Sequence, residues 1–103
     1  MGELLKIGTV SEILPGTCRH VEVAGRDVAV FNVEGTIYAI GGICTHKGGP
    51  LGEGELEGAV VTCPWHGAEF DVTTGQVLGP PASQGVPTYT VVIEGEDISV
   101  EIP

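Results

Sequence analysis

Basic side chains are scarce in this sequence. Four lysines and arginines stand against fourteen acidic side chains, which gives a formal net charge of −10. Nucleic acids and anionic membranes are attracted to cationic surfaces, so this balance argues against both as partners. A partner with a basic surface is the better expectation. Glu53, Glu55 and Glu57 alternate with other residues, and an extended segment would project them from one face. Such a face is either a solvated strand surface or a docking patch for a partner.

Cysteines and long apolar runs are also few. Three cysteines cannot all pair, so a disulfide framework is not expected, and an unpaired thiol points to a reducing compartment. A hydrophobic share of 42% over 103 residues is enough to fill one core in a single domain. No segment reaches the roughly 18 apolar residues that span a bilayer, and the first residues lack the pattern of a secretory signal. We therefore expect a monomeric, cytoplasmic protein.

Helical periodicity is absent from the sequence. Ser11-Glu12-Ile13-Leu14 before Pro15 could form at most one turn, and no segment sustains a period of 3.6 residues. Short alternating patterns recur instead, with turn signals at residues 24–27 and 34–36 and a closing hairpin around residues 95–97. The alternating apolar positions are Val21, Val23, Val28, Val30, Ile37, Ala39, Tyr89, Val91, Ile93, Ile98, Val100 and Ile102. This pattern predicts an all-β fold of antiparallel strands.

Two short motifs carry the metal-binding chemistry, and each pairs one thiol with one imidazole. Cys44-Thr45-His46 is followed, after sixteen intervening residues, by Cys63-Pro64-Trp65-His66. A zinc finger usually takes two sulfurs from one knuckle and two nitrogens from another. Mixed pairs instead allow two cysteines to share one metal and two histidines a second, if the loops lie side by side. Two sulfide-bridged irons with these two ligand pairs form the Rieske arrangement.

Residues 44–49 and 63–67 resemble the two cluster loops of Rieske [2Fe-2S] proteins, and Gly79-Pro80-Pro81 resembles the proline-rich loop that covers the cluster in that family. The resemblance implies one [2Fe-2S] cluster, with Cys44 and Cys63 on the inner iron and His46 and His66 on the outer iron, which takes the electron. It also implies the Rieske fold, a single domain over residues 1–103. That fold is an antiparallel β-sandwich base with an inserted, rubredoxin-like cluster-binding subdomain.

The inserted subdomain is expected at about residues 41–87. Eleven of the seventeen glycines and five of the seven prolines fall within this range. Glycine lets backbone N–H groups approach sulfur closely, and proline stiffens loops that must hold their shape through a redox change. Short strands are predicted at residues 60–62 and 69–71.

The resemblance points to the ferredoxins of bacterial multicomponent aromatic-ring dioxygenases. Such a protein carries one electron at a time from a flavin-containing ferredoxin reductase to a terminal oxygenase. The sequence shows no arrangement of a nucleophile and a base, so the protein is not expected to be an enzyme by itself. One alternative within the family is the small subunit of an NAD(P)H nitrite reductase. An alternative of another class is a structural zinc module that binds a protein partner.

The sequence departs from the respiratory Rieske type at four positions. Gly49 and Trp65 stand where that type has two further cysteines, so the bracing disulfide cannot form. Ala68 and Phe70 stand where it tends to have serine and tyrosine, whose hydroxyls donate hydrogen bonds toward the cluster sulfurs. Fewer donors leave the reduced cluster less stabilised. We expect a potential near the low end of the Rieske range, close to about −150 mV.

Three other residues receive structural or minor roles. Cys18 is expected to be a small packed side chain, since free cysteine is among the most buried residue types. His20 lies in an apparent strand at residues 19–23 without a second ligand nearby in sequence, so it too is expected to be structural. Lys47 is expected either to be solvated or to help steer a partner.

Overall fold

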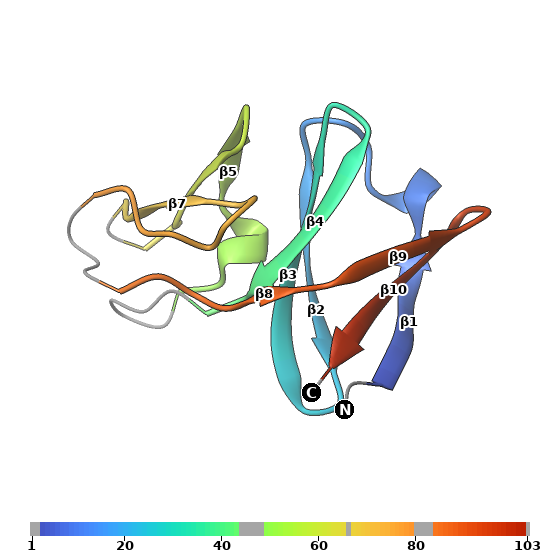
Figure 1. Ribbon diagram of the computed structural model, residues 1–103. Coiled ribbons are helices and arrows are strands. Elements are labelled where there is room, and N and C mark those ends of the chain that lie inside the picture. Colours follow the sequence, from blue (N-terminus) through green and yellow to red (C-terminus); the bar gives the residue numbers. More distant parts are fainter. Residues whose placement is uncertain (1–2, 44–48, 66, 80–83, 103) are drawn as a thin grey trace.

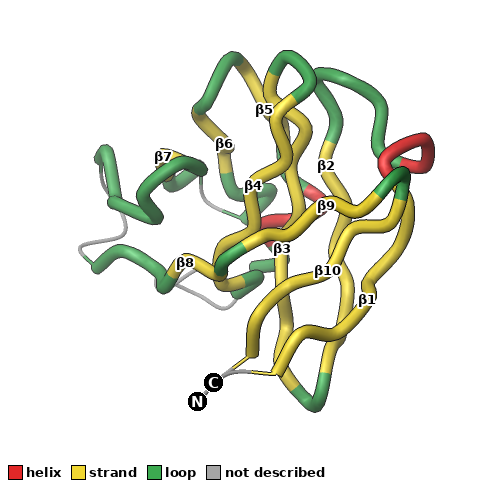
Figure 2. Tube along the Cα trace, turned by 45° about the vertical axis from the view of Figure 1, so that its right-hand side comes forward, coloured by secondary structure: helices red, strands yellow, loops and turns green. Residues whose placement is uncertain are grey.

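The computed structural model describes residues 3–43, 49–65, 67–79 and 84–102, and Figures 1 and 2 trace their path. Strands dominate these residues, and the only helical elements among them are two single 3₁₀ turns, η1 and η2. η1 occupies part of the segment that was expected to form at most one turn. The elements are β1 (Glu3–Thr9), η1 (Val10–Glu12), β2 (Cys18–Val23), β3 (Arg26–Val33), β4 (Thr36–Gly41), η2 (Leu51–Glu53), β5 (Glu55–Glu57), β6 (Val60–Thr62), β7 (Glu69–Asp71), β8 (Thr88–Tyr89), β9 (Val91–Glu94) and β10 (Asp97–Ile102).

The strands form three antiparallel sheets. Their strand orders are β1-β10-β9, β2-β3-β4-β8 and β5-β6-β7. The prediction of an all-β, antiparallel fold is confirmed, and so are the short strands expected at residues 60–62 and 69–71.

Two-residue turns join β2 to β3 and β3 to β4. Ala24 and Gly25 have φ values of 51° and 77°, and Glu34 and Gly35 have 51° and 95°. Positive φ at both central residues is the type I′ geometry, whose twist matches that of the flanking strands. Glycine adopts this conformation without steric cost, which explains its place in both turns. The first turn is shorter than the sequence suggested, because Arg26 already pairs with Val23.

The first two sheets pack face to face as a sandwich, which we call the base. Its core takes apolar side chains from β10 in one sheet and from β3 and β4 in the other. The buried members are Ile13, Val23, Val28, Val30, Ile37, Ala39, Ile98, Val100 and Ile102. Most of these positions are the alternating apolar residues of the sequence, which point to one face of each strand. The base core therefore follows directly from that alternation.

Strand β3 is buried on both faces. Val28 and Val30 face the base core, whereas Ala29 and Phe31 belong to a second core. All four side chains are fully buried. The second core joins β3 and β4 to the third sheet through Leu51, Val61, Cys63, Ala68, Phe70, Val72 and Val86. A central strand with two buried faces thus connects the base to the part of the chain that carries both motifs.

The third sheet lies, in sequence, between two paired strands of the base. The chain leaves the base at the end of β4 and returns at β8, where Ala39 pairs with Tyr89 and Ile40 with Thr88. Figure 1 shows the third sheet on the left, beside the base. A Cβ atom built on Gly52 would lie 2.5 Å from the backbone nitrogen of His20, so η2 packs against β2 at backbone distance. The exact limits of a subdomain at about 41–87 stay a prediction.

Asn32 is the one buried polar side chain in the described part of the chain. Its Nδ2 donates to the Ile13 carbonyl at 2.8 Å, and its Oδ1 accepts from the Gly35 N–H at 2.8 Å. The first bond reaches the segment after η1, and the second lies within the β3–β4 turn. Asn32 therefore links that segment to the base. As for membranes, the described residues contain no helix with the length and hydropathy to cross one.

Candidate metal centre

The structure describes Cys63 among the four expected ligands. Cys44, His46 and His66 lie outside the described residues, as do Lys47 and the prolines Pro80 and Pro81. Within the described ranges, no three His, Cys, Asp or Glu side chains gather as metal ligands. The site is therefore built below from Cys63 and from the described residues that flank each loop.

Cys63 directly follows β6 and lies in the second core. It is 2% exposed. Its backbone N–H donates to the Ala68 carbonyl at 2.7 Å, which extends the β6–β7 pairing by one step around the loop. The backbone N–H of Trp65 donates to the Cys63 Sγ at 3.4 Å. A backbone N–H aimed at sulfur is a feature by which proteins hold and tune metal-bound cysteines.

The ends of the first loop meet beside this sulfur. Ile43 and Pro50 form an antiparallel bridge, and the Leu51 N–H donates to the Gly42 carbonyl at 2.8 Å. A Cβ atom built on Gly49 would lie 2.7 Å from the Cys63 Sγ, closer than real Cβ contacts allow. The backbone of Gly49 therefore passes directly against the sulfur. The fold brings the flanks of the two motifs together, although they are distant in sequence.

This arrangement fits a metal-bound sulfur. The Cys63 sulfur is sheltered from water, receives a backbone N–H and faces a residue without a side chain. Backbone donors to sulfur and shelter from water are the features by which a protein tunes an iron–sulfur cluster. The surroundings of the Cys63 sulfur thus suit a cysteine that binds such a cluster.

Ala68 and Phe70, which replace the serine and tyrosine of the respiratory type, are both fully buried. The Ala68 carbonyl accepts the Cys63 N–H. Phe70 pairs with Val61 across β6 and β7. Neither side chain has a hydroxyl, and Phe70 fills the core below the loop. Their contribution here is apolar packing.

Comparison with known proteins assigns the family. The model of the Rieske [2Fe-2S] domain matches residues 3–90. The chain belongs to the Rieske family. The match spans both motifs and the strands from β1 to β8, and it ends before β9. The resemblance stated from the motifs is confirmed.

Several ferredoxins resemble this Rieske domain over nearly its full length. The ferredoxin component of a naphthalene 1,2-dioxygenase system from Pseudomonas aeruginosa is 41% identical over 91 residues, which cover 88% of each chain. The structure of a complex of reduced oxygenase and oxidized ferredoxin in carbazole 1,9a-dioxygenase contains a match at 35% identity and TM-score 0.89, covering 94% of this chain and 91% of the other.

A chain assigned as the small subunit of an NADH-dependent nitrite reductase from Mycobacterium tuberculosis also matches. It is 21% identical, with a TM-score of 0.86, and the match covers 100% of this chain and 97% of the other. Identity this low shows a shared fold and carries no functional assignment.

Three exposed apolar side chains flank the loops of the Rieske domain. Ile43 precedes the first loop, Trp65 lies in the second and Leu78 precedes the third, and they are 40%, 49% and 49% exposed. The Leu78 N–H donates to the Glu69 carbonyl at 2.8 Å, which holds the start of the third loop to β7. Leu4, Leu14 and Ile93 in the base are exposed to a similar degree, so what distinguishes these three side chains is their place next to the loops. Sequence reasoning did not single out Ile43 or Leu78, because one exposed apolar residue carries no local signal.

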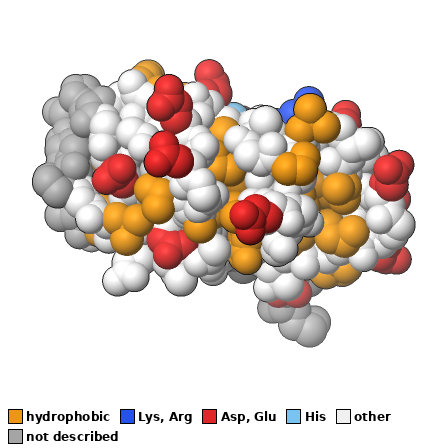
Figure 3. Space-filling model, turned by 90° about the horizontal axis from the view of Figure 1, so that it is seen from above, with side chains coloured by type: hydrophobic (Ala, Val, Ile, Leu, Met, Phe, Trp, Pro, Cys, Tyr) orange, Lys and Arg blue, Asp and Glu red, His pale blue; other side chains and the backbone are white. Residues whose placement is uncertain are grey.

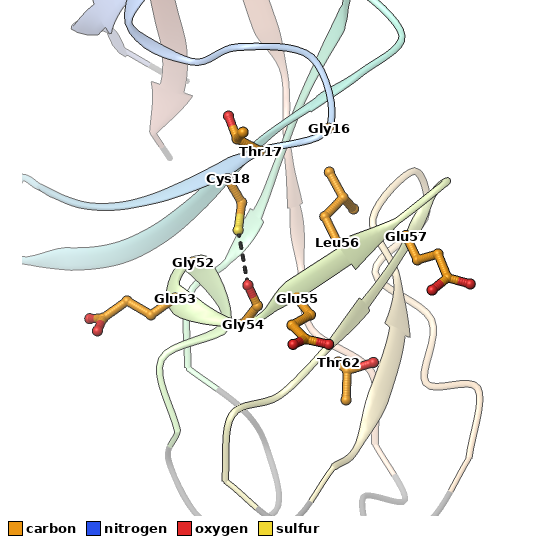
Figure 4. Close-up of a pocket in the computed structure, with 10 residues that line it drawn as sticks. All are labelled: Gly16, Thr17, Cys18, Gly52, Glu53, Gly54, Glu55, Leu56, Glu57 and Thr62. Atoms are coloured by element: carbon orange, nitrogen blue, oxygen red, sulfur yellow. Dashed lines mark hydrogen bonds between the residues drawn. The ribbon is translucent and has the colours of Figure 1, made fainter.

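The three glutamates of the sequence do not form one strand face. Glu55 and Glu57 lie on β5, but Glu53 belongs to the 3₁₀ turn η2, so the expectation of one extended segment is wrong for Glu53. Figure 4 shows Glu53 pointing away from the other two. All three are exposed and line an open cleft of about 640 Å³ between the Gly16–Cys18 segment and β5. Figure 3 shows acidic side chains spread over the visible face rather than gathered in one patch.

Cys18 and His20 have the structural roles that the sequence suggested. The Cys18 thiol packs against the second core and donates to the Gly54 carbonyl at 3.4 Å (Figure 4). Burial raises the pKa of this thiol, so it stays protonated and unreactive at neutral pH. The Nε2 of His20 contacts Asp27 Oδ1 at 3.0 Å. The sequence gave no sign of this pair, since it joins neighbouring strands diagonally.

Proposed function

We propose that this Rieske domain is a one-electron carrier that takes electrons from a flavin-containing ferredoxin reductase and passes them to a terminal oxygenase. The observation that carries the proposal is the buried Cys63 sulfur, held under Gly49 and the Trp65 N–H at the junction of the two motifs. Similarity to ferredoxin components of dioxygenase systems supports the same role. The protein is then an electron-transfer component and not a catalyst by itself.

We propose Cys44, His46, Cys63 and His66 as the ligands of one [2Fe-2S] cluster. When bound, the cluster supplies one-electron redox chemistry at a higher potential than an all-cysteine centre, because two neutral imidazoles replace two thiolates. Cys44 and Cys63 would hold one iron, and His46 and His66 the other. Cys63 provides a preorganised, water-excluded sulfur, since its loop is fixed by the bond to Ala68 and by the backbone of Gly49.

Partner docking is proposed at the end of the molecule where Ile43, Trp65 and Leu78 are exposed. The matched ferredoxin in the carbazole 1,9a-dioxygenase structure forms a complex with its oxygenase, which supports a terminal oxygenase as one partner of this chain. The unpaired Cys18 thiol suits the reducing cytoplasm that we propose as its location.

Cluster identity is tested on the purified protein. We expect two irons and two acid-labile sulfides per chain, following the stoichiometry of one [2Fe-2S] cluster, and the low average g value of mixed nitrogen and sulfur ligation. A His46→Cys variant that retains its cluster should have a lower potential, because a thiolate adds negative charge at the histidine-bound iron. Cys18→Ala is the matched control and should retain the cluster unchanged. One zinc and no labile sulfide would instead establish the structural zinc module.

Electron transfer is tested by stopped-flow reduction with a flavoprotein ferredoxin reductase. The net charge of −10 predicts that reduction slows as salt is raised, since screening removes long-range attraction to a basic partner surface. The reduced protein should then be reoxidised by the terminal oxygenase of an aromatic-ring dioxygenase. Exchange with an NAD(P)H nitrite reductase but with no oxygenase would assign the nitrite reductase role. If reduction is fast and its rate does not depend on salt, the acidic surface contributes to solubility and not to docking.

A further inference from the structure

Trp65 is the only tryptophan of the chain, and it occupies an unusual place. Its side chain is 49% exposed, while the sulfur of Cys63, two residues earlier, is almost fully buried. Its backbone N–H donates to that sulfur at 3.4 Å. One half of this large side chain therefore faces solvent, and the other half lies against the loops.

Gly49 identifies what the inner half touches. A Cβ atom built on Gly49 would lie 3.0 Å from both Cβ and Cγ of Trp65, and 2.7 Å from the Cys63 sulfur. The φ angle of Gly49 lies outside the left-handed region that favours glycine. Glycine is thus required at this position by space and not by backbone conformation. The backbone of one loop, the stem of the Trp65 side chain and the Cys63 sulfur meet at one point.

We propose that Trp65 is a positioning residue that clasps the two loops together. Its Cβ and Cγ pack on the backbone of Gly49, hold the Trp65 N–H in line with the Cys63 sulfur and keep water and reagents from that sulfur. The contact joins segments that are consecutive neither in sequence nor in any sheet. The role concerns the isolated protein, so it differs from partner docking by the exposed half of the same ring. Its effect on cluster retention rests on the proposed function, whereas its effect on the sulfur does not.

The structure separates this clasp from ordinary surface packing. Ile93 on β9 is 44% exposed, close to the value for Trp65, but it lies in the base. Removing either side chain deletes a similar half-buried apolar group. Trp65, unlike Ile93, packs on Gly49 and donates its backbone N–H to the buried sulfur. Ile93→Ala is therefore the matched control.

The test measures the loss of visible absorbance when the oxidised holoprotein is mixed with an iron chelator. We expect about a tenfold faster loss for Trp65→Ala. Trp65→Phe should stay within about twofold of the wild type, because it keeps Cβ, Cγ and a ring. Ile93→Ala should match the wild type. A tenfold change corresponds to about 1.4 kcal/mol, less than the deletion of a fully buried aromatic side chain. If Trp65→Ala does not fold, Gly49→Ala replaces it in the same comparison, because its new Cβ displaces the Trp65 stem.

Alkylation of Cys63, followed by peptide mass mapping, is the second measurement. It separates failure of the clasp from failure of the proposed function. Mapping distinguishes Cys63 from Cys18, and the rate can be measured on protein that holds no iron. We expect Trp65→Ala to raise the Cys63 alkylation rate about tenfold in either state, with no change at Cys18. Gly49→Ala should act in the same direction and shift the emission of Trp65, because the new Cβ displaces the side-chain stem.

Two results would overturn the proposal. Rates for Trp65→Ala that equal those for Ile93→Ala would show that the ring only docks partners. Equal acceleration by Trp65→Phe and Trp65→Ala would show that the Cβ and Cγ contact with Gly49 does not protect the sulfur. A wild-type protein that cannot be loaded with an iron–sulfur cluster would refute the electron-carrier function. Faster alkylation of Cys63 in Trp65→Ala would still support the clasp in that case.

Discussion

Strand β3 allows the base and the third sheet to be compared directly, because each uses one of its faces. In the base, Val28 and Val30 meet side chains of β4 and β10, and the core consists mainly of β-branched residues on regular strands. On the other face, Ala29 and Phe31 meet a core whose members lie partly in turns and loops, such as Leu51 and Val72. The base is held by long strand ladders. The third sheet has strands of three residues and depends on close packing.

Glycine shows the same difference. In the turns of the base, Gly25 and Gly35 have positive φ, and a Cβ would meet nothing within 4 Å. Around the third sheet, Gly49 and Gly52 lie against other parts of the chain, where a Cβ would meet a sulfur or a backbone. Gly25 and Gly35 therefore solve a conformational problem. Gly49 and Gly52 solve a problem of space, because their lack of a side chain lets two segments of the chain approach closely.

The largest effects are expected from the two cores. Phe70→Ala should lower the free energy of unfolding by about 3–5 kcal/mol, and Ile98→Ala by about 2–5 kcal/mol, because each leaves a cavity in a filled core. Phe70→Ala should also reduce iron content and alter the visible spectrum. Ile98→Ala, in the base, should leave the spectrum of the folded protein intact. Denaturant melts and iron analysis check both. Equal spectral changes would show that the two cores do not act separately.

Gly52→Ala and Gly25→Ala compare the two uses of glycine. The Cβ at position 52 would press on the His20 backbone, so we expect overpacking to cost about 1–3 kcal/mol and to loosen the third sheet from the base. The Cβ at position 25 meets open space, and only its positive φ opposes it, at about 1 kcal/mol. Thermal unfolding gives both costs, and hydrogen exchange in β5–β7 should increase in Gly52→Ala alone. A larger cost at position 25 would reverse the comparison.

The potential should respond to hydroxyl groups near the metal centre and not to those elsewhere in the same core. Phe70→Tyr should raise the reduction potential by on the order of 50 mV if its hydroxyl donates toward sulfur. For a one-electron couple, this shift corresponds roughly to the free energy of one hydrogen bond. Phe31→Tyr, on β3, is the matched control and should leave the potential unchanged. Redox titration followed by visible absorbance provides the values. A wild-type potential well above zero would contradict the argument from missing donors.

The smallest effects concern two carboxylates, one in each region. The hydroxyl and the N–H of Thr73 bond Asp71 Oδ1 at 2.6 and 2.8 Å and lower the pKa of that carboxyl. The Thr9 N–H, at 2.8 Å, is the main cause that lowers the pKa of Glu12. Thr73→Val should thus raise the pKa of Asp71 clearly, because the hydroxyl is the main cause. Thr9→Val should change Glu12 less, because its backbone donor remains. Side-chain NMR titrations measure both pKa values. A larger change at Glu12 than at Asp71 would contradict the prediction.

The sign of the pH dependence follows from these lowered pKa values. A carboxyl whose folded pKa lies below its unfolded pKa of about 4 stabilises the protein above that value. The contribution disappears as pH falls through the folded pKa. Both groups are exposed enough for water to screen them, so the effect on stability should be small. Thr73→Val should therefore lower the free energy of unfolding slightly at neutral pH, and the difference from the wild type should disappear as pH falls through the folded pKa of Asp71.

Much of the fold could be predicted from local pattern. Alternation at Val28 and Val30 or at Ile98 and Val100 reveals a strand with one buried face, because side chains repeat every two residues. The same logic failed to show that Ala29 and Phe31 are buried as well. These two apolar residues on the other face of the strand are too few to reveal a second core. Glu53 appeared to continue the β5 pattern but lies in η2. Three-residue strands leave too few positions to settle such a boundary.

The sequence by itself determined the ligand types, their order and spacing, and the excess of acidic side chains, because these are properties of the chain and not of its packing. Those features were enough to point to the Rieske family. Only the tertiary structure placed Gly49 against the Cys63 sulfur and Trp65, brought Gly52 to the His20 backbone, and paired His20 with Asp27. These contacts join segments with no shared periodicity. They depend on how the two cores pack on β3, which no local pattern encodes.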